Sequence, residues 1–192
     1  MKNEDLFLQL KQVEYANATM EDLDSLVLDK ASGSLLWDVE GNEYIDLCAG
    51  FGSLPLGHSH PCIQEALKAY LGDFPLVMQG LGDVYSSRDK VELLNVVQGL
   101  LPVHLQKGGL VATGSQAVEL ALRTACLATG GKRFICFSGA YHGLDLGVLP
   151  LVGRDDFSHS FDMLQPGYCT TRLAYGCSRE TLVATITQYA KA

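Results

Sequence analysis

Two short segments of the sequence combine residue types that could hold a small molecule. In the first, Gly114 and Ser115 stand where the apolar stretch 110–112 gives way to a helical pattern. The N–H groups of a helix's first turn have no partner within the helix, and the helix dipole is positive there. We therefore expect an anion at this point, with Gln116 adding a third N–H group. The alternative interpretation is an ordinary serine N-cap that follows a glycine turn.

The second segment places an aromatic ring at the end of another apolar stretch. Tyr141 follows residues 133–138 closely and precedes His142 and Gly143. Such a ring can lie over a flat π system, and a glycine lets the backbone approach closely. Tyr141 could instead cap the end of a strand, and His142 could act as a general base or pack beside a ligand. An anion site combined with an aromatic ring suggests pyridoxal phosphate.

The elements that must position these residues can be read from hydrophobic spacing and turn residues. We expect strands over 110–112 and 133–138, with a helix from about Ser115 to Ala128 between them. Such a strand–helix–strand unit makes its two strands parallel. The other expected elements are a helix or arm within 1–33, a hairpin over 34–47, a glycine-rich loop over 48–60, a helix from Pro61, a helix from Ser86 or Ser87 to Pro102, and a helix over 179–191.

Composition limits the classes of function. The 192 residues are 47% hydrophobic and 19% charged, which is typical of a globular protein, and no apolar run approaches the length of a membrane span. The net charge of −8, without a block rich in lysine or arginine, argues against nucleic acid or a membrane as a partner. The N-terminus does not resemble a secretory signal, so we expect a cytoplasmic protein. Six cysteines without a paired spacing predict reduced, mostly buried thiols.

Two further groups of polar residues have structural interpretations. His58 and His60 could suggest a metal site, but no cysteine or carboxylate stands at a fitting spacing, so we expect no metal. Glu119 and Arg123 lie one helical turn apart, which favours an ion pair on the helix surface.

Three segments together resemble a known family. The first segment, Gly41–Leu67, contains the pattern G-x-x-Y-I-D, then G-H-x-H-P, then A-L. The second segment is Asp83–Pro102. The third segment reads ATGSQAVELAL, followed by GAYHG. In this order they resemble the N-terminal half of the class III aminotransferases, the acetylornithine, ornithine and 4-aminobutyrate group of pyridoxal-phosphate enzymes. The resemblance spans most of residues 36–153. The chain departs from the family's usual pattern at Gln116, where the family has glutamate, and at Ala112–Thr113.

The resemblance implies an architecture. It implies an α/β fold of the type I pyridoxal-phosphate transferases, present here in part. Residues 1–72 would form the N-terminal arm and a segment of the small domain. Residues 73–192 would form the first part of the large, cofactor-binding domain, whose sheet is mainly parallel.

The resemblance also implies roles for particular residues. The phosphate would be held by Gly114, Ser115 and Gln116, and the cofactor ring by Tyr141 with His142 beside it. A backbone contact to phosphate survives the change to glutamine at position 116, whereas a role for a charged side chain there does not. Phe51 and Gly52 correspond to a loop at the mouth of the substrate pocket; simple loop packing is the alternative.

The activity that the resemblance implies is transfer of an amino group between a primary amine or amino acid and a 2-oxo acid, by a homodimer. Related aminomutases and epimerases share these motifs. The family's cofactor lysine and pyridine-binding aspartate lie further downstream, and none of the chain's lysines stands in a matching context. We therefore expect the isolated chain to be a truncated, inactive part of such an enzyme, with no catalytic residue identifiable in it. The alternatives are a non-catalytic remnant or dimerisation partner, or one half of a split enzyme.

Overall fold

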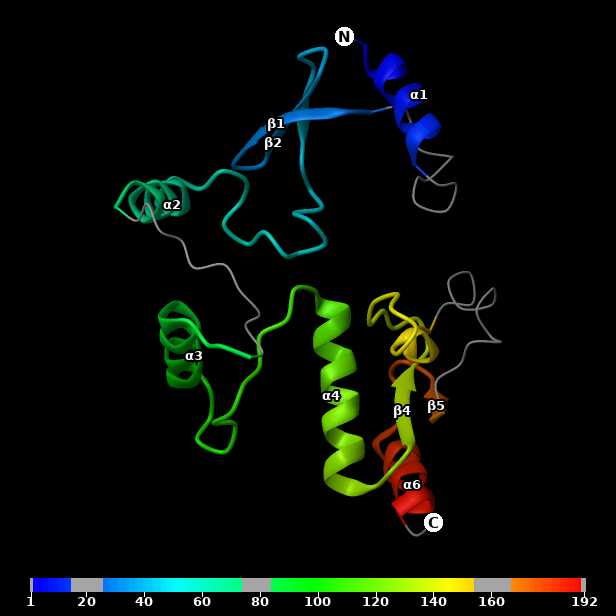
Figure 1. Cartoon of the computed structure of the whole chain (residues 1–192). Helices are drawn as coiled ribbons and strands as arrows, with labels where there is room; N and C mark the ends of the chain where they lie inside the picture. The colour runs from blue at the N-terminus through cyan, green and yellow to red at the C-terminus, as the bar shows by residue number, and fades with distance from the viewer. Residues whose placement is uncertain (1, 15–25, 74–83, 154–166, 191–192) are drawn as a thin grey trace. The chain divides into compact units, whose positions relative to one another are not determined.

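The computed structural model describes residues 2–14, 26–73, 84–153 and 167–190. The chain divides into two compact units, Met1–Tyr85 and Ser86–Ala192, which are considered separately (Figure 1). The domain boundary after residue 72 stays a prediction, because the segment 74–83 that follows it lies outside the described residues.

The first unit is built on a three-stranded antiparallel sheet. Its elements are α1 (Asn3–Val13), β1 (Leu28–Ser32), β2 (Leu35–Asp38), β3 (Glu43–Ile45) and α2 (Pro61–Asp73). The strands pair in the order β1-β2-β3, and the pairing of β2 with β3 confirms the predicted hairpin. The start of α2 at Pro61 is confirmed as well.

Strand β1 was not predicted, since the sequence suggested only a helix or arm before residue 34. The helix exists as α1, but residues 28–32 pair with β2. A two-residue turn joins the strands, and Gly33 adopts a φ of 58° there, which suits glycine. The strand is largely exposed and half polar, so it carries no alternating hydrophobic signal.

Asp38 is the buried polar centre of this unit, with 1% of its surface exposed. Its carboxylate accepts hydrogen bonds from Asn3 Nδ2 at 2.8 Å, Asn42 Nδ2 at 2.9 Å and the Tyr44 hydroxyl at 2.9 Å. Burial acts to raise the pKa of Asp38, but the hydrogen bonds from Asn42, Asn3 and Tyr44 together hold it well below its usual range. These contacts fasten α1 to the β2–β3 hairpin.

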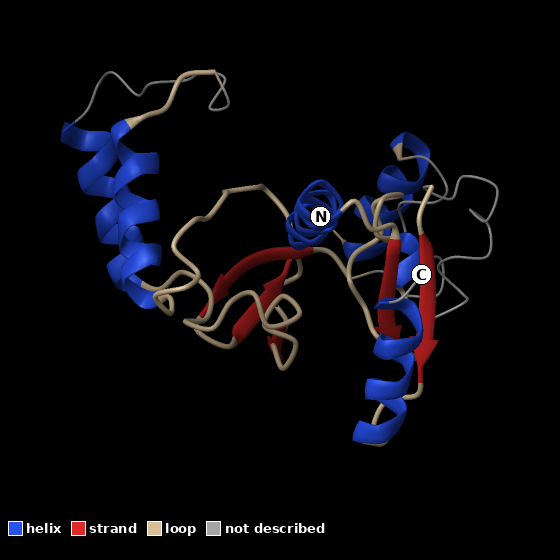
Figure 2. Cartoon of the chain, turned by 90° about the horizontal axis from the view of Figure 1, so that it is seen from below, coloured by secondary structure: helices blue, strands red, loops and turns tan. Residues whose placement is uncertain are grey.

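The second unit combines helices with a two-stranded parallel sheet. Its elements are α3 (Arg88–Leu100), α4 (Gly114–Thr129), β4 (Arg133–Phe137), the short 3₁₀ turn η1 (Leu149–Leu151), β5 (Cys169–Leu173) and α6 (Arg179–Ala190). Strands β4 and β5 lie side by side in parallel (Figure 2). Four buried apolar residues in and beside η1, together with Cys136 of β4, form the core: Val148, Leu149, Leu151 and Val152.

The ends of the helices follow their capping residues. Ser87 caps α3 as predicted, since its Oγ accepts a hydrogen bond from the N–H of Lys90 at 3.2 Å. Helix α4 begins one residue earlier than predicted and is capped by Thr113. It ends at Gly130, whose φ of 70° is left-handed, and the chain then reverses direction into β4 (Figure 1). The helix predicted over 179–191 is confirmed by α6 within the described residues.

The predicted strand over 110–112 is wrong. A strand needs a partner in a ladder, and within the described part of the chain this segment pairs with no other. The N–H of Ala112 donates instead to Gln116 Oε1 at 3.1 Å. The parallel partner of β4 is β5, with Arg133 opposite Cys169 and Phe137 opposite Leu173.

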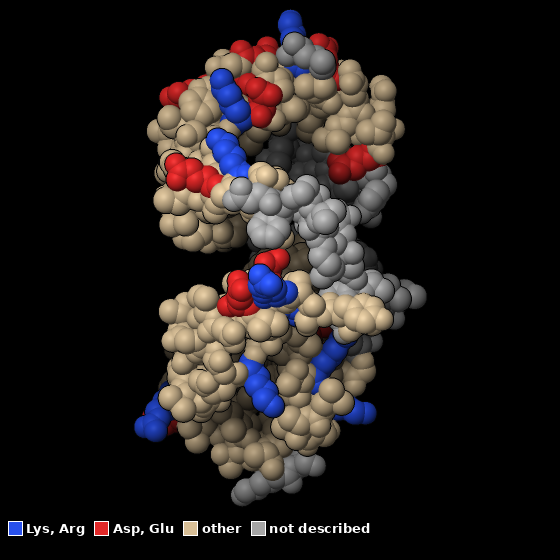
Figure 3. All heavy atoms as spheres, turned by 60° about the vertical axis from the view of Figure 1, so that its left-hand side comes forward, with Lys and Arg blue, Asp and Glu red and all other residues tan. Residues whose placement is uncertain are grey.

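The surface carries charges of both signs. On the face drawn in Figure 3, acidic and basic side chains are interspersed over the described atoms. No helix within the described ranges has both the length and the apolar character needed to cross a membrane. The prediction of mostly buried thiols is wrong: the six cysteines are free, and of these only Cys136 is buried.

Candidate functional site

A pocket of about 460 Å³ lies where α4 begins and the loop after β4 passes over it. Both predicted segments contribute to its walls. It is lined by Thr113, Gly114, Ser115, Val118, Tyr141, His142, Gly143 and Leu144. The structure thus brings four of the five predicted cofactor residues to one pocket, and Gln116 is the exception.

The first turn of α4 presents donors to this pocket. Gln116 donates its N–H to Thr113 Oγ1 at 3.2 Å, and Ala117 donates its N–H to the carbonyl oxygen of Thr113. The N–H groups of Gly114 and Ser115 have no hydrogen-bond acceptor among the described residues. Two main-chain donors, rather than the expected three, are therefore available to an anion at the positive end of the helix dipole.

Ser115 joins the two walls of the pocket. Its Oγ accepts a hydrogen bond from the N–H of Asp145 at 3.1 Å. Gly143 packs against it so closely that a Cβ added to the glycine would lie 2.4 Å from both Cβ and Oγ of Ser115. Because the serine oxygen accepts from the main chain, its own hydrogen can be donated to a ligand.

Tyr141 forms the accessible wall, with 60% of its surface exposed, and His142 beside it is half-buried. The loop that carries them is closed at its base by two hydrogen bonds, from Gly139 N–H to the carbonyl of Gly153 at 3.1 Å and from Gly153 N–H to the carbonyl of Ala140 at 2.8 Å. This closure holds the tyrosine near the end of β4, where a flat ligand could lie against it.

Sequence reasoning missed the roles of Thr113, which caps α4 and lines this pocket, and of Asp145, whose N–H fastens the loop to Ser115. A signal for the first was present, because threonine followed three positions later by glutamine is the pattern of a capping box. The Gln116 side chain does reach back, although to the N–H of Ala112 instead of the cap residue itself. The hydrogen bond from Asp145 joins residues distant in sequence and has no local signal.

One turn after Ser115 on α4, Glu119 forms the predicted ion pair with Arg123. They line a neighbouring pocket of about 460 Å³ together with Gln116 and Asp145. The basic side chain of this pocket, Arg123, is paired with Glu119, and Asp145 adds a second carboxylate, so the pocket offers no anion-binding donors comparable to those of Gly114 and Ser115.

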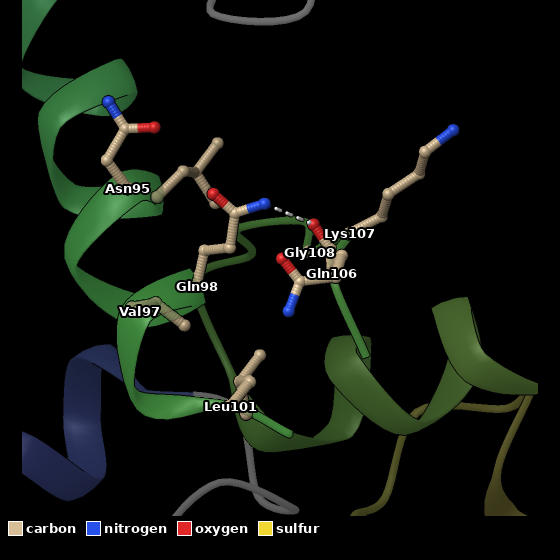
Figure 4. Close-up of a pocket in the computed structure, with 8 residues that line it drawn as sticks. Asn95, Val97, Gln98, Leu101, Gln106, Lys107 and Gly108 are labelled. Carbon is tan, nitrogen blue, oxygen red and sulfur yellow. Dashed lines mark hydrogen bonds between the residues drawn. The ribbon is translucent and has the colours of Figure 1, made fainter. Parts of the chain in front are cut away.

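A further pocket, of about 330 Å³, lies between α3 and the segment 106–108 (Figure 4). Its polar groups are mainly amides: Gln98 donates from Nε2 to the carbonyl of Gln106 at 3.1 Å, and the Lys107 side chain points away. Amides supply neither a nucleophile nor an acid–base group. This pocket is therefore a weaker candidate for chemistry.

Phe51 and Gly52 lie in the first unit, in the loop between β3 and α2. Phe51 is 99% exposed and has a φ of 56°. The structure describes the two units separately, so the place of these residues at a substrate pocket stays a prediction.

Asp46 and His58 fix the ends of this loop. The Asp46 carboxylate lies 2.7 Å from His58 Nε2 and accepts the N–H groups of Cys48 at 2.8 Å and Ala49 at 2.9 Å. The hydrogen bond to His58, followed by those from Ala49 and Cys48, holds the pKa of Asp46 below its usual value. His58 thus has a structural partner, and the described residues contain no group of three or more metal-ligating side chains.

The chain is similar in sequence to known proteins. Residues 15–190 match the family model described as aminotransferase class-III. The acetylornithine aminotransferase of Methanopyrus kandleri is 32% identical over 143 residues, covering 74% of this chain and 36% of that protein. The 5-aminovalerate aminotransferase of Pseudomonas aeruginosa is 35% identical over 167 residues, covering 84% of this chain and 38% of that protein.

Solved structures are similar over nearly the whole chain. The adenosylmethionine-8-amino-7-oxononanoate aminotransferase of Methanocaldococcus jannaschii superposes with a TM-score of 0.81 at 22% identity, covering 98% of this chain and 45% of that one. The taurine:2-oxoglutarate aminotransferase of Bifidobacterium kashiwanohense, solved with pyridoxal phosphate and glutamate, gives 0.72 at 19% identity, covering 98% and 43%. The chain therefore has the fold of a part of these proteins and spans 36% to 38% of the length of the two sequence relatives named above.

Proposed function

The chain belongs to the class-III aminotransferases, and from this we propose that it forms the part of such an enzyme that holds the phosphate and ring of pyridoxal phosphate. The complete enzyme would move an amino group between a primary amine or amino acid and a 2-oxo acid. The observation that carries the proposal is the single pocket that joins the open N–H groups of Gly114 and Ser115 to the ring of Tyr141.

The residues present fit such a ligand. Gly114 and Ser115 supply two main-chain donors, and the Ser115 hydroxyl hydrogen supplies a third, so together they suit a phosphate group. Tyr141 supplies an exposed aromatic face for a flat ring on the opposite wall. Gln116 takes a different part: its main-chain and side-chain groups hold Thr113 and Ala112 in place, so that the helix begins at the pocket.

The chemistry that pyridoxal phosphate supplies when bound is withdrawal of electrons from the substrate carbon. This chain's own contribution is to bind and orient. The Ser115 and Gly114 donors would hold its phosphate, Tyr141 would lie against its ring, and His142 would stand beside it.

Direct binding tests the proposal. The chain should bind pyridoxine phosphate, which has the same ring and phosphate but no aldehyde that could attach to surface lysines. We expect Ser115→Ala and Tyr141→Ala each to weaken binding roughly tenfold, as expected for loss of one contact to a charged or aromatic group. Ser178→Ala is the matched control, because Ser178 accepts the N–H of Thr181 at 3.1 Å at the start of α6, away from the pocket. Unchanged affinity in both site variants would defeat the proposal.

A further inference from the structure

The loop that carries Tyr141 is held against α4 at alternate positions. Gly143 packs on Ser115, Asp145 donates its N–H to the same serine, and a Cβ at Gly147 would lie 2.6 Å from Cδ of Glu119. Ser115 and Glu119 are one turn apart and so share a face of the helix. The segment from Gly143 to Gly147 therefore lies along one face of α4, directly after Tyr141 and His142.

Two side chains reach the far part of this loop: Arg172 donates to the carbonyl oxygen of Val152 at 2.6 Å, and Tyr168 holds Gly147, the position nearer to Tyr141. The hydroxyl of Tyr168, which lies just before β5, donates to the carbonyl oxygen of Gly147 at 2.7 Å. The ring of Tyr168 is itself fixed, because it meets Phe134 of β4 edge to face, with centroids 5.2 Å apart and an interplanar angle of 80°. Its hydroxyl thus reaches from the sheet to the loop.

The tyrosine acts as a permanent donor. Burial, reinforced by the nearby Cys136 and Glu119, raises the pKa of Tyr168 to about 12. The hydroxyl therefore keeps its hydrogen at neutral pH. Its partner, a main-chain carbonyl, does not titrate either, so the contact is insensitive to pH.

We propose that Tyr168 is a positioning residue of the candidate site, which holds Tyr141 and His142 in register with the first turn of α4 through the carbonyl of Gly147. The expected effect of Tyr168 on cofactor binding rests on the proposed function. Tyr168 is not among the residues that line the pocket, and it acts on them through the loop.

The test compares Tyr168→Phe with Tyr175→Phe by hydrogen exchange and by binding. The first variant removes only the hydroxyl and keeps the ring against Phe134; the second makes the same chemical change at a side chain that is 89% exposed. We expect Tyr168→Phe to speed exchange of the Asp145 amide about 5- to 10-fold, the effect of losing one hydrogen bond, while amides in the middle of α4 keep their rates. Affinity for pyridoxine phosphate should fall by a similar factor, and Tyr175→Phe should change neither quantity.

Two results would overturn the inference. One is an Asp145 amide that exchanges at the same rate in Tyr168→Phe; the other is equal acceleration throughout α4 and β4, which would make the hydroxyl a general stabiliser. The proposed function fails separately, if the unaltered chain binds no pyridoxine phosphate while the Asp145 amide still responds to the substitution.

Discussion

Gly143 and Ser115 are in contact across the candidate site, with room for no side chain between them: a Cβ on the glycine would lie 2.4 Å from the serine Cβ. Gly143 also has a φ of 108°, a conformation that other residues rarely adopt. This contact brings the helix start and the aromatic loop together into one pocket.

Replacement of this glycine should be unusually costly. Gly143→Ala combines backbone strain with a clash, for a loss of about 2–4 kcal/mol in the free energy of unfolding. Gly139→Ala is the matched control, because Gly139 has a φ of 78° but nothing within 4 Å of an added Cβ, so only the strain of about 1 kcal/mol applies. Urea denaturation followed by circular dichroism measures both, and equal losses would contradict the packing described here.

The helix start gives a second prediction. Thr113→Ala should lower the free energy of unfolding by about 1 kcal/mol, because it removes the side chain that caps α4. Ser115→Ala leaves that cap intact and should instead free the amide of Asp145 to exchange. If Ser115→Ala destabilised the helix start and Thr113→Ala did not, serine would be the cap after all.

The sequence predicts the helices of this protein well because their signals are local. Ser87, Pro61 and Gly130 mark helix ends through capping and backbone preferences that depend only on neighbouring residues. A strand forms only where its main chain finds a hydrogen-bonding partner, which can be distant in sequence. Residues 110–112 have the apolar composition of a strand, yet no ladder partner exists for them among the described residues, whereas the largely exposed β1 gains one through the turn at Gly33.

The candidate site likewise combines residues that have a local sequence signal with contacts that depend on the fold. Gly114, Ser115 and Tyr141 could be chosen from the sequence because each stands at the end of a recognisable element. The contacts of Asp145 with Ser115 and of Tyr168 with Gly147 join distant residues, and only the fold brings them together.

Acid should weaken the loop between β3 and α2 through Asp46. The folded protein lowers the pKa of this carboxyl, chiefly through the hydrogen bond to His58, so the ionised form contributes stability that is fully present above its unfolded pKa of about 3.9. That contribution is lost as pH falls from about 5 through the lower, folded value. Asp46→Asn should therefore flatten the dependence of stability on pH in this range, as followed by hydrogen exchange at Cys48 and Ala49.

Asp29 provides the control for this experiment, since it is an exposed carboxylate on β1. Asp29→Asn should leave the pH dependence of exchange at Cys48 and Ala49 as it is in the unaltered chain. If exchange at Cys48 and Ala49 depended on pH in Asp46→Asn as it does in the unaltered chain, another group would be responsible.

Helix α1 should depend on one amide side chain. Asn3 donates to Asp38 and accepts the N–H of Val27 at 2.8 Å, so Asn3→Ala removes contacts at both ends of the side chain. We expect faster hydrogen exchange throughout α1 and little change in α2. Asn95→Ala, in the other unit, is a control for the loss of an asparagine side chain; protection of α1 that persisted in Asn3→Ala would mean that other contacts hold the helix.

The most direct test of the central claim is to follow the amide resonances of the chain while pyridoxine phosphate is added. The account predicts saturable shifts centred on Gly114, Ser115 and Tyr141, with competition by inorganic phosphate at the first two. Shifts centred instead on the amide-lined pocket around Gln98, or the absence of any saturable shift, would contradict the assignment of the cofactor site.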